Sequence, residues 1–424
     1  MGSNFPLQFN TIPYPIWRRN LPFGLSNLLQ PLAERYLAAD VDLNLPTTPE
    51  AVASFMSRWG LLNNIDIRTT IQTLNGDFPT LEVTQPEQIK PPVPFSLNTK
   101  VRLPAQWEPI ETILLTWPSI YPALWEQHAQ MVEAIMPVSS VTILVTNAMW
   151  AKAAYLFLVQ RAKADLSRVR FIQLPTNDVW VRDYGPIVGQ NVKGEQVTVK
   201  LVFDPLPSYP QQLDNTMTLR WAAHEEIPVR HLDLHLEGGN IWSDGQGTLI
   251  MASQIFHSNP GLTRTKLLDQ LHSVFNFSKL IITPRLEREE TGHVDLLVKL
   301  ADSQTVLIPR ATGFNRAALH QTAEIFRRTT NALGQPYRIF EQPNPPLYLN
   351  WAVYPVWRTY TNSLTVNGWV LVPVFGISSD AQALDVYRKA MPDFNIIPID
   401  CAPGANGGGT VHCLTKEIAA PRRG

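Results

Sequence analysis

The chain has 424 residues and a net charge of −1, and charged residues make up 17% of it, below the ~25% usual for globular proteins. With no basic excess or Lys/Arg run, neither nucleic acid nor an anionic membrane is indicated as a partner, and two cysteines do not build a disulfide-stapled secreted fold. No signal peptide is evident in residues 1–19, and no apolar window approaches the ~18 residues of a transmembrane helix. We therefore expect a soluble, cytoplasmic protein.

The first hundred residues are rich in proline, but they also carry aromatic residues and leucines, which is not typical of disorder. Thr48 predicts the start of a helix that ends near Gly60. A second helix is predicted over 28–37, and the prolines of 91–94 predict an extended linker. Because no catalytic set occurs in residues 1–100, we interpret them as an accessory region that packs on the main domain or on another subunit.

From residue 101 onward, apolar runs of strand length alternate with segments of helical spacing. This pattern predicts an α/β fold in which strand pairs are separated by single helices. The predicted strands are 113–117, 141–145, 169–174, 196–203, 247–252, 280–283, 295–300, 305–309, 361–366, 369–375 and 395–398. The predicted helices are 123–135, 151–162, 264–275, 316–333 and 380–391.

Polar motifs stand between these elements, most of them beside a glycine. They are 177–186, 236–241, 291–296, 360–363 and 404–417. Together they offer the thiol of Cys413, the imidazole of His293 and several carboxylates. Asp183 precedes Glu237 by 54 positions, and Glu237 precedes His293 by 56. This spacing suggests a structural repeat that places one polar signature in each unit.

The glycine-rich segment 404–409 precedes Cys413 and lets the backbone approach a ligand closely. A thiol delivered by such a loop onto a strand over 410–414 suits a nucleophile. His293 and Asp295 are two positions apart in a predicted strand, so we expect both side chains on the same face.

Taken alone, each motif also has an ordinary structural explanation. Cys413 is compatible with a small core residue, and His293 with a hydrogen-bonded core histidine. Asp183 is compatible with a surface ion pair to Arg182. Asp295 is harder to explain in this way, because a carboxylate against an apolar strand needs a partner when it is buried. Together these groups fit the attack of a thiolate on a planar cationic substrate.

These motifs, in this order, resemble the agmatine deiminase and bacterial-type peptidylarginine deiminase family of the guanidino-group-modifying, or pentein, superfamily. The resemblance covers residues 101 to about 418 and rests on 103–109, 116–119, 180–186, 237–241, 292–295 and 407–413. It implies an α/β pentein propeller of five ββαβ units around a central active site. We therefore expect a catalytic domain at 101–424 and an N-terminal accessory region of unknown role at 1–100.

The resemblance also implies roles for individual residues. Cys413 matches the nucleophile, His293 the general acid/base and Glu237 its carboxylate partner, while Asp183 and Asp295 match the pair that holds the guanidinium. Further substrate-binding candidates are Trp180, Asn240 and Gly408. The implied reaction hydrolyses a guanidino group through a covalent Cys-amidino intermediate and releases ammonia and a ureido product. No metal or organic cofactor is implied, and the question of a homo-oligomer stays open.

The residues leave the guanidino substrate open between agmatine and a peptidyl or free arginine. The loop 203–215 contains no Arg or Lys to clamp a substrate carboxylate, and its residues Asp204 and Asp214 suit an amine, which favours agmatine. The segment 360–364 and the nearby Arg358 favour the peptidylarginine type. An amidinotransferase would use the same five residues. A non-catalytic pentein that binds a partner has no need of the thiol.

Overall fold

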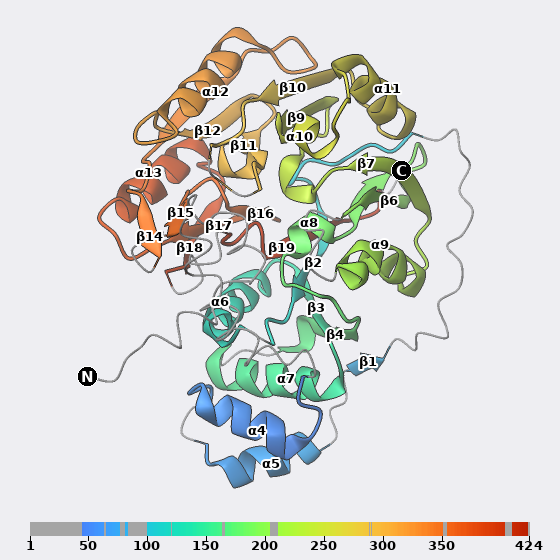
Figure 1. The fold of residues 1–424 in the computed structure, drawn as a ribbon, viewed down its shortest axis with the longest axis vertical. Helices are drawn as coiled ribbons and strands as arrows, with labels where there is room; N and C mark the ends of the chain where they lie inside the picture. Colours follow the sequence, from blue (N-terminus) through green and yellow to red (C-terminus); the bar gives the residue numbers. More distant parts are fainter. Residues whose placement is uncertain are drawn as a thin grey trace.

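The computed structural model describes residues 45–62, 65–76, 81–83, 100–119, 121–162, 166–203, 211–287, 289, 291–350, 354–402 and 409–422. Figure 1 shows how their helices and strands are arranged. The helix predicted over 28–37 and the linker 91–94 lie outside the described residues. Within the described ranges, no helix combines the length and the apolar character needed to cross a membrane.

Five sheets share one pattern of three strands, in which the second strand runs antiparallel to the first and parallel to the third. Figure 1 shows these sheets around a common centre. Their strands are β5 (Ile187–Gln190), β6 (Gln196–Val202) and β7 (Val229–His235); β8 (Trp242–Ser243), β9 (Thr248–Ala252) and β10 (Lys279–Thr283); β11 (Lys299–Asp302), β12 (Thr305–Pro309) and β13 (Arg338–Gln342); β16 (Leu364–Val366), β17 (Trp369–Val374) and β18 (Asn395–Asp400); and β19 (Thr415–Ala419), β2 (Ile110–Thr116) and β3 (Ser140–Val145).

A helical connection joins the two parallel strands of each unit. In chain order these helices are α6 (Trp125–Ile135), which follows the 3-10 turn η2 (Pro122–Leu124); α9 (Gln212–His224); α10 (Gln254–Ser258) with α11 (Arg264–Val274); α12 (Arg316–Arg328); and α13 (Asp380–Ala390). The units are therefore the ββαβ units of the pentein fold, and the predicted fold class is confirmed. The C-terminal strand β19 pairs with β2, so the last segment of the chain completes the first unit.

Two N-terminal helices pack against the first unit. The hydroxyl of Thr48 accepts a hydrogen bond from the backbone of Ala51 at 3.3 Å, which confirms the predicted helix start. Val52, Met56 and Leu74 from these helices belong to the same buried cluster as the side chains of α6 and α7. The boundary at residue 100 stays a prediction. The elements of this part are α4 (Pro49–Arg58), α5 (Ile67–Asn75), α7 (Ala148–Ala162), η3 (Leu166–Arg168), β4 (Val169–Gln173) and β1 (Leu81–Val83), which pairs with β4.

The segment that carries His293 and Asp295 is not a strand. His293 is the N-cap residue of a short 3-10 helix, η5 (Val294–Leu296), and β11 begins only at Lys299. The prediction of a strand over 295–300 is therefore wrong in its first part. The backbone N–H of Val294 donates to the side chain of Asn240. The N–H groups of Leu297 and Val298 donate to the carbonyl of Val294, so these groups are satisfied without a strand ladder.

Two other segments near the centre also turn before their strand begins. The segment 410–414 forms a turn and β19 starts at Thr415, so the prediction of a strand that carries the thiol is wrong. The strand predicted over 361–366 starts at Leu364. Both strands start late for the same reason. Oδ1 of Asn362 accepts hydrogen bonds from three backbone N–H groups of 410–414 and thereby holds the two turns together.

The other strands and helices that were predicted for the main domain are present to within a few residues, apart from one helix. The helix predicted over 316–333 ends at Arg328. Thr330 pairs with Pro336 in an isolated β-bridge, which the helix cannot continue through. The remaining two-stranded sheet joins β14 (Tyr348–Asn350) and β15 (Tyr354–Val356).

Candidate active site

The site-bearing segments connect one unit of the fold to the next. Asp183 lies in α8 (Val181–Tyr184) after β4, and Glu237 follows β7 directly before the 3-10 helix η4 (Gly238–Asn240). His293 lies between β10 and η5, and Cys413 lies between β18 and β19. The spacings of 54 and 56 positions thus reflect successive units of the fold. Because these connections meet, the structure brings together residues from opposite ends of the catalytic domain.

His293, Glu237 and Asp183 form a buried acid–base group. Nε2 of His293 donates to Oε2 of Glu237 at 2.6 Å, and Nδ1 lies 3.5 Å from Oδ1 of Asp183. Burial lowers the pKa of His293, but the carboxylates of Asp183 and Glu237 outweigh it and raise the pKa to about 10. Burial also raises the pKa of Asp183, to about 6. The imidazole is therefore protonated at neutral pH and can act first as an acid.

The thiol of Cys413 is buried beside Asp295. Nδ2 of Asn362 donates to Sγ of Cys413 at 3.0 Å and to Oδ2 of Asp295 at 3.1 Å. The Sγ atom lies 3.8 Å from the same carboxylate oxygen. Burial raises the pKa of the Cys413 thiol, and the carboxylates of Asp295 and Asp183 raise it further. A cation bound between these carboxylates would lower that pKa, so substrate binding can generate the thiolate.

Trp180, a predicted substrate-binding residue, packs against the turn that carries the thiol. A Cβ at Gly409 would lie 2.5 Å from the Trp180 ring and 2.7 Å from Cβ of Cys413, so only glycine permits this approach. Gly408 lies outside the described residues.

Asn240, another predicted substrate-binding residue, is buried and makes its hydrogen bonds to the backbone. Its Oδ1 accepts from the N–H of Ala252 at 2.8 Å and of Val294 at 3.2 Å. These bonds hold η4 against η5 and so position Glu237 and His293 relative to each other. The role in substrate binding stays a prediction.

A second imidazole, which the sequence analysis left without a role, supports Asp295. Nδ1 of His412 lies 2.7 Å from Oδ2 of Asp295, and its Nε2 lies 3.1 Å from Nε2 of Gln106. Oε1 of Gln106 accepts from Nζ of Lys299 and from the backbone of Thr365, so the Gln106 amide must donate to His412. The proton of His412 therefore sits on Nδ1 and is donated to Asp295.

The surroundings keep this second imidazole neutral. Burial lowers the pKa of His412, and the nearby charge of Arg182 lowers it further. The ring stacks on Trp242 with centroids 4.7 Å apart. The motifs 103–109 and 407–413 contained both Gln106 and His412, but no local signal in the sequence shows that they touch.

Two polar atoms of the site lack a hydrogen-bond partner within the described part of the chain. They are Oδ1 of Asp295 and Nδ1 of His293, both buried. Buried polar atoms of folded proteins are almost always hydrogen-bonded, so such exceptions need an explanation. A ligand that carries N–H donors would satisfy the oxygen of Asp295.

The alternative in which Asp183 forms a surface pair with Arg182 is wrong. Arg182 is buried, and its guanidinium binds Oε2 of Glu417 at 2.5 Å. Its Nε also donates to the carbonyl of His412 at 3.1 Å. Arg182 thus anchors β19 and the thiol-bearing turn, which leaves Asp183 facing His293.

The residues considered for substrate selection have structural contacts of their own. The carboxylate of Asp214 accepts from the backbone N–H of Asn177 at 2.7 Å, so it holds the turn before Trp180. Arg358 lies over the ring of Tyr348, 3.7 Å from its centroid. Asp204 lies outside the described residues.

The donor atoms of Asp183, Glu237 and His293 also lie within 4.8 Å of one another, a spacing that suits a metal ion. An imidazole nitrogen must be deprotonated to bind a metal ion. The two carboxylates raise the pKa of His293 to about 10, so a metal ion would have to displace a proton from this imidazole in order to bind it.

Five ββαβ units that enclose a thiol, an imidazole and paired carboxylates define a pentein of the guanidino-group-modifying type. The family model for the Porphyromonas-type peptidyl-arginine deiminase matches residues 102–419, and the chain belongs to this family. It is accordingly an enzyme of the deiminase type, a hydrolase that acts on C–N bonds, rather than a binding protein of the same fold.

Relatives of known name cover most of the chain. An agmatine deiminase of Pseudomonas syringae pv. syringae (strain B728a) is 29% identical in an alignment of 370 residues that covers 76% of this chain and 96% of the relative. The structure of an Enterococcus faecalis agmatine deiminase matches with a TM-score of 0.66 at 21% identity, over 77% of this chain and 96% of that one. A C. jejuni agmatine deiminase variant with substrate bound matches with a TM-score of 0.67 at 18% identity, over 78% and 99%. At these identities the two structures establish the fold alone.

Proposed function

We propose that this chain hydrolyses agmatine to N-carbamoylputrescine and ammonia through a covalent intermediate on Cys413. The observation that carries the proposal is the position of the thiol, 3.8 Å from the carboxylate of Asp295 and in one buried site with the His293 group. A guanidinium is a planar cation with N–H donors along its edges, which carboxylates can grip from two sides. Asp183 and Asp295 would form this grip.

In the first step, Sγ of Cys413 attacks the central carbon of the guanidinium. The bound cation lowers the pKa of the thiol, and the proton that the thiol loses leaves the site as substrate binds. A tetrahedral adduct forms, His293 donates its proton to one amino group, and the C–N bond to that group breaks with release of ammonia. The product of this step is an amidino thioether on Cys413.

In the second step, water attacks the same carbon. His293, deprotonated by the first step, accepts one proton of the water. The C–S bond then breaks, and the departing sulfur takes the second proton, which restores the thiol of Cys413. The ureido product then leaves. Glu237 holds His293 in place throughout, because Nε2 donates to it at 2.6 Å while Nδ1 points towards Asp183 and is available for proton transfer.

The choice of agmatine over a peptidyl or free arginine rests on the named relative, which is an agmatine deiminase. Arg358 does not decide the choice, because a guanidinium stacked on the ring of Tyr348 keeps its N–H edge for a carboxylate. The family name favours peptidylarginine, which is the second candidate and would yield citrulline.

A parallel incubation with agmatine, free arginine and an arginine-terminated peptide tests the proposal, with ureido product and ammonia as readouts. We expect turnover of agmatine above the other two substrates. Ureido product from the peptide alone would replace agmatine by peptidylarginine. Transfer of the amidino group to an added amine would identify an amidinotransferase. No turnover of any guanidine by the folded protein would end the proposal.

A further inference from the structure

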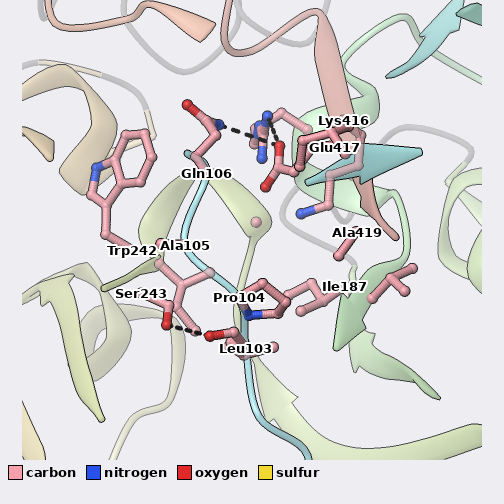
Figure 2. Close-up of a pocket in the computed structure, with 15 residues that line it drawn as sticks. Leu103, Pro104, Ala105, Gln106, Ile187, Trp242, Ser243, Lys416, Glu417 and Ala419 are labelled. Atoms are coloured by element: carbon pink, nitrogen blue, oxygen red, sulfur yellow. Dashed lines mark hydrogen bonds and ion pairs between the residues drawn. The ribbon is translucent and has the colours of Figure 1, made fainter. Parts of the chain in front are cut away.

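A cavity with a volume of about 50 Å³ lies next to the candidate site. Figure 2 shows it between the segment 103–106 and β19, with the side chain of Lys416 extending into it. The volume is enough for a few water molecules or a small ion, since the centre of one water molecule needs about 10–15 Å³ of such space. The charged residues that line it are Arg182, Lys416 and Glu417, two cations and one carboxylate.

Lys416 differs from the other two charged groups in having no partner. Arg182 and Glu417 bind each other at 2.5 Å, which neutralises both. Lys416 is only 3% exposed, and among the described residues its ammonium forms neither a hydrogen bond nor an ion pair. An ammonium carries three N–H donors, and an unpaired buried charge is costly. The side chains that line the cavity therefore carry a net charge of about +1, and Lys416 is attracted by the carboxylates of Glu417 and Asp183 without a hydrogen bond to either.

A thin wall of backbone separates this charge from the site that contains the thiol. A Cβ at Gly238 would lie 3.0 Å from Nζ of Lys416, so Lys416 borders one side of the wall. A Cβ at Gly239 would lie 2.7 Å from Oδ1 of Asp183, which borders the other. The two glycines thus place the ammonium of Lys416 within electrostatic reach of Asp183, whose carboxylate attracts it across the wall.

We propose that this cavity binds a small monovalent inorganic anion, of the size of chloride, on the ammonium of Lys416. The cavity supplies one excess positive charge and N–H donors, which an anion of charge −1 satisfies completely. Its volume of about 50 Å³ has room for a chloride ion beside this ammonium. Glu417 is already bound to Arg182, so it repels the anion less than a free carboxylate would.

Anion binding has a consequence for the reaction that rests on the proposed function. The charge of Lys416 behind Asp183 weakens the binding of a cationic guanidinium, and an anion on Lys416 relieves this repulsion. Chloride should therefore lower the KM for the guanidino substrate more than it changes kcat. The coupling must be reciprocal, so bound substrate should tighten chloride binding.

Thermal unfolding in sodium chloride and in sodium gluconate at equal ionic strength tests the binding itself, and gluconate is too large for the cavity. We expect a saturable rise of Tm with chloride, because a tenfold excess over Kd increases the folding constant about elevenfold. Lys416→Met should abolish this rise. The matched control, Lys389→Met, removes an exposed lysine of α13 and should retain it.

The line width of the ³⁵Cl NMR signal gives a second readout that does not depend on stability. Wild type and Lys389→Met should broaden the chloride signal in a saturable way, and Lys416→Met should not. An equal Tm of wild type in both salts, or an unchanged response in Lys416→Met, would overturn the proposal. Because neither measurement uses turnover, failure of the deiminase activity would leave their outcome interpretable.

Discussion

Replacing Asp295 by Asn tests the guanidinium grip most sharply. Asp295 is fully buried, and Nδ1 of His412 and Nδ2 of Asn362 both donate to the same oxygen, Oδ2. The thiol of Cys413 also lies at this oxygen, at 3.8 Å. In Asp295→Asn the carbonyl oxygen must take that position, because an NH₂ group there would face two donors. The NH₂ group then occupies the position of Oδ1, where the guanidinium would offer its own N–H groups.

The loss can be estimated from this geometry. A hydrogen bond to a charged group contributes about 1.5–3 kcal/mol, which corresponds to a change in kcat/KM by a factor of about 10–150. Because the variant also places a donor against a donor, we expect kcat/KM for agmatine to fall about 100-fold or more. The amide is nearly isosteric with the carboxylate and keeps the contact to His412, so the protein should remain folded.

Alkylation by iodoacetamide provides a readout of opposite sign. The charge of Asp295 raises the pKa of the Cys413 thiol, so its removal should lower that pKa and speed alkylation of the substrate-free enzyme at pH 7. The matched control is Asp269→Asn, the same chemical change at an exposed position of α11, and it should alter neither rate. Normal turnover by Asp295→Asn, or alkylation slower than in wild type, would refute the assignment.

Four further outcomes are expected. Cys413→Ser should abolish turnover while Cys401→Ser retains it, as measured by ammonia release, and alkylation of Cys413 should be blocked by substrate; turnover by Cys413→Ser near the wild-type rate would exclude the covalent route. Asp183→Asn should lower kcat/KM about 10-fold or more for loss of a charge-assisted contact, and an unchanged value would remove Asp183 from the grip. His293→Ala should accumulate the amidino adduct, detectable in the intact protein mass, with Glu237→Gln intermediate in rate; a stalled His293→Ala enzyme without adduct would contradict the second step. The folded pKa of His293 is raised from 6.5 to about 10, so its stabilising contribution is complete below pH 6.5 and is lost as pH rises through about 10; the difference in unfolding free energy between wild type and His293→Ala should shrink over this range in urea titrations, and a growing difference would reverse the assigned sign.

The sequence by itself determined the elements that depend on local spacing. The apolar runs at 113–117 and 141–145 fall in the buried strands β2 and β3, because a run of consecutive β-compatible residues favours a strand through local composition alone. Thr48 begins a helix because its hydroxyl reaches a backbone N–H three residues away. The chemical inventory of the site was also readable, because motifs such as 180–186 and 407–413 keep their order along the chain.

Tertiary structure alone decided which polar groups meet. Gln106 and His412 are 306 positions apart, yet their contact sets the tautomer that supports Asp295. Asn362 reaches Cys413 only because two units of the fold meet at the centre. Local spacing encodes where a strand or helix runs, but it carries no information about side chains brought together by the packing of separate units. For the same reason the sequence alone did not indicate that the fold buries the ammonium of Lys416 without a hydrogen bond to any residue that the structure describes.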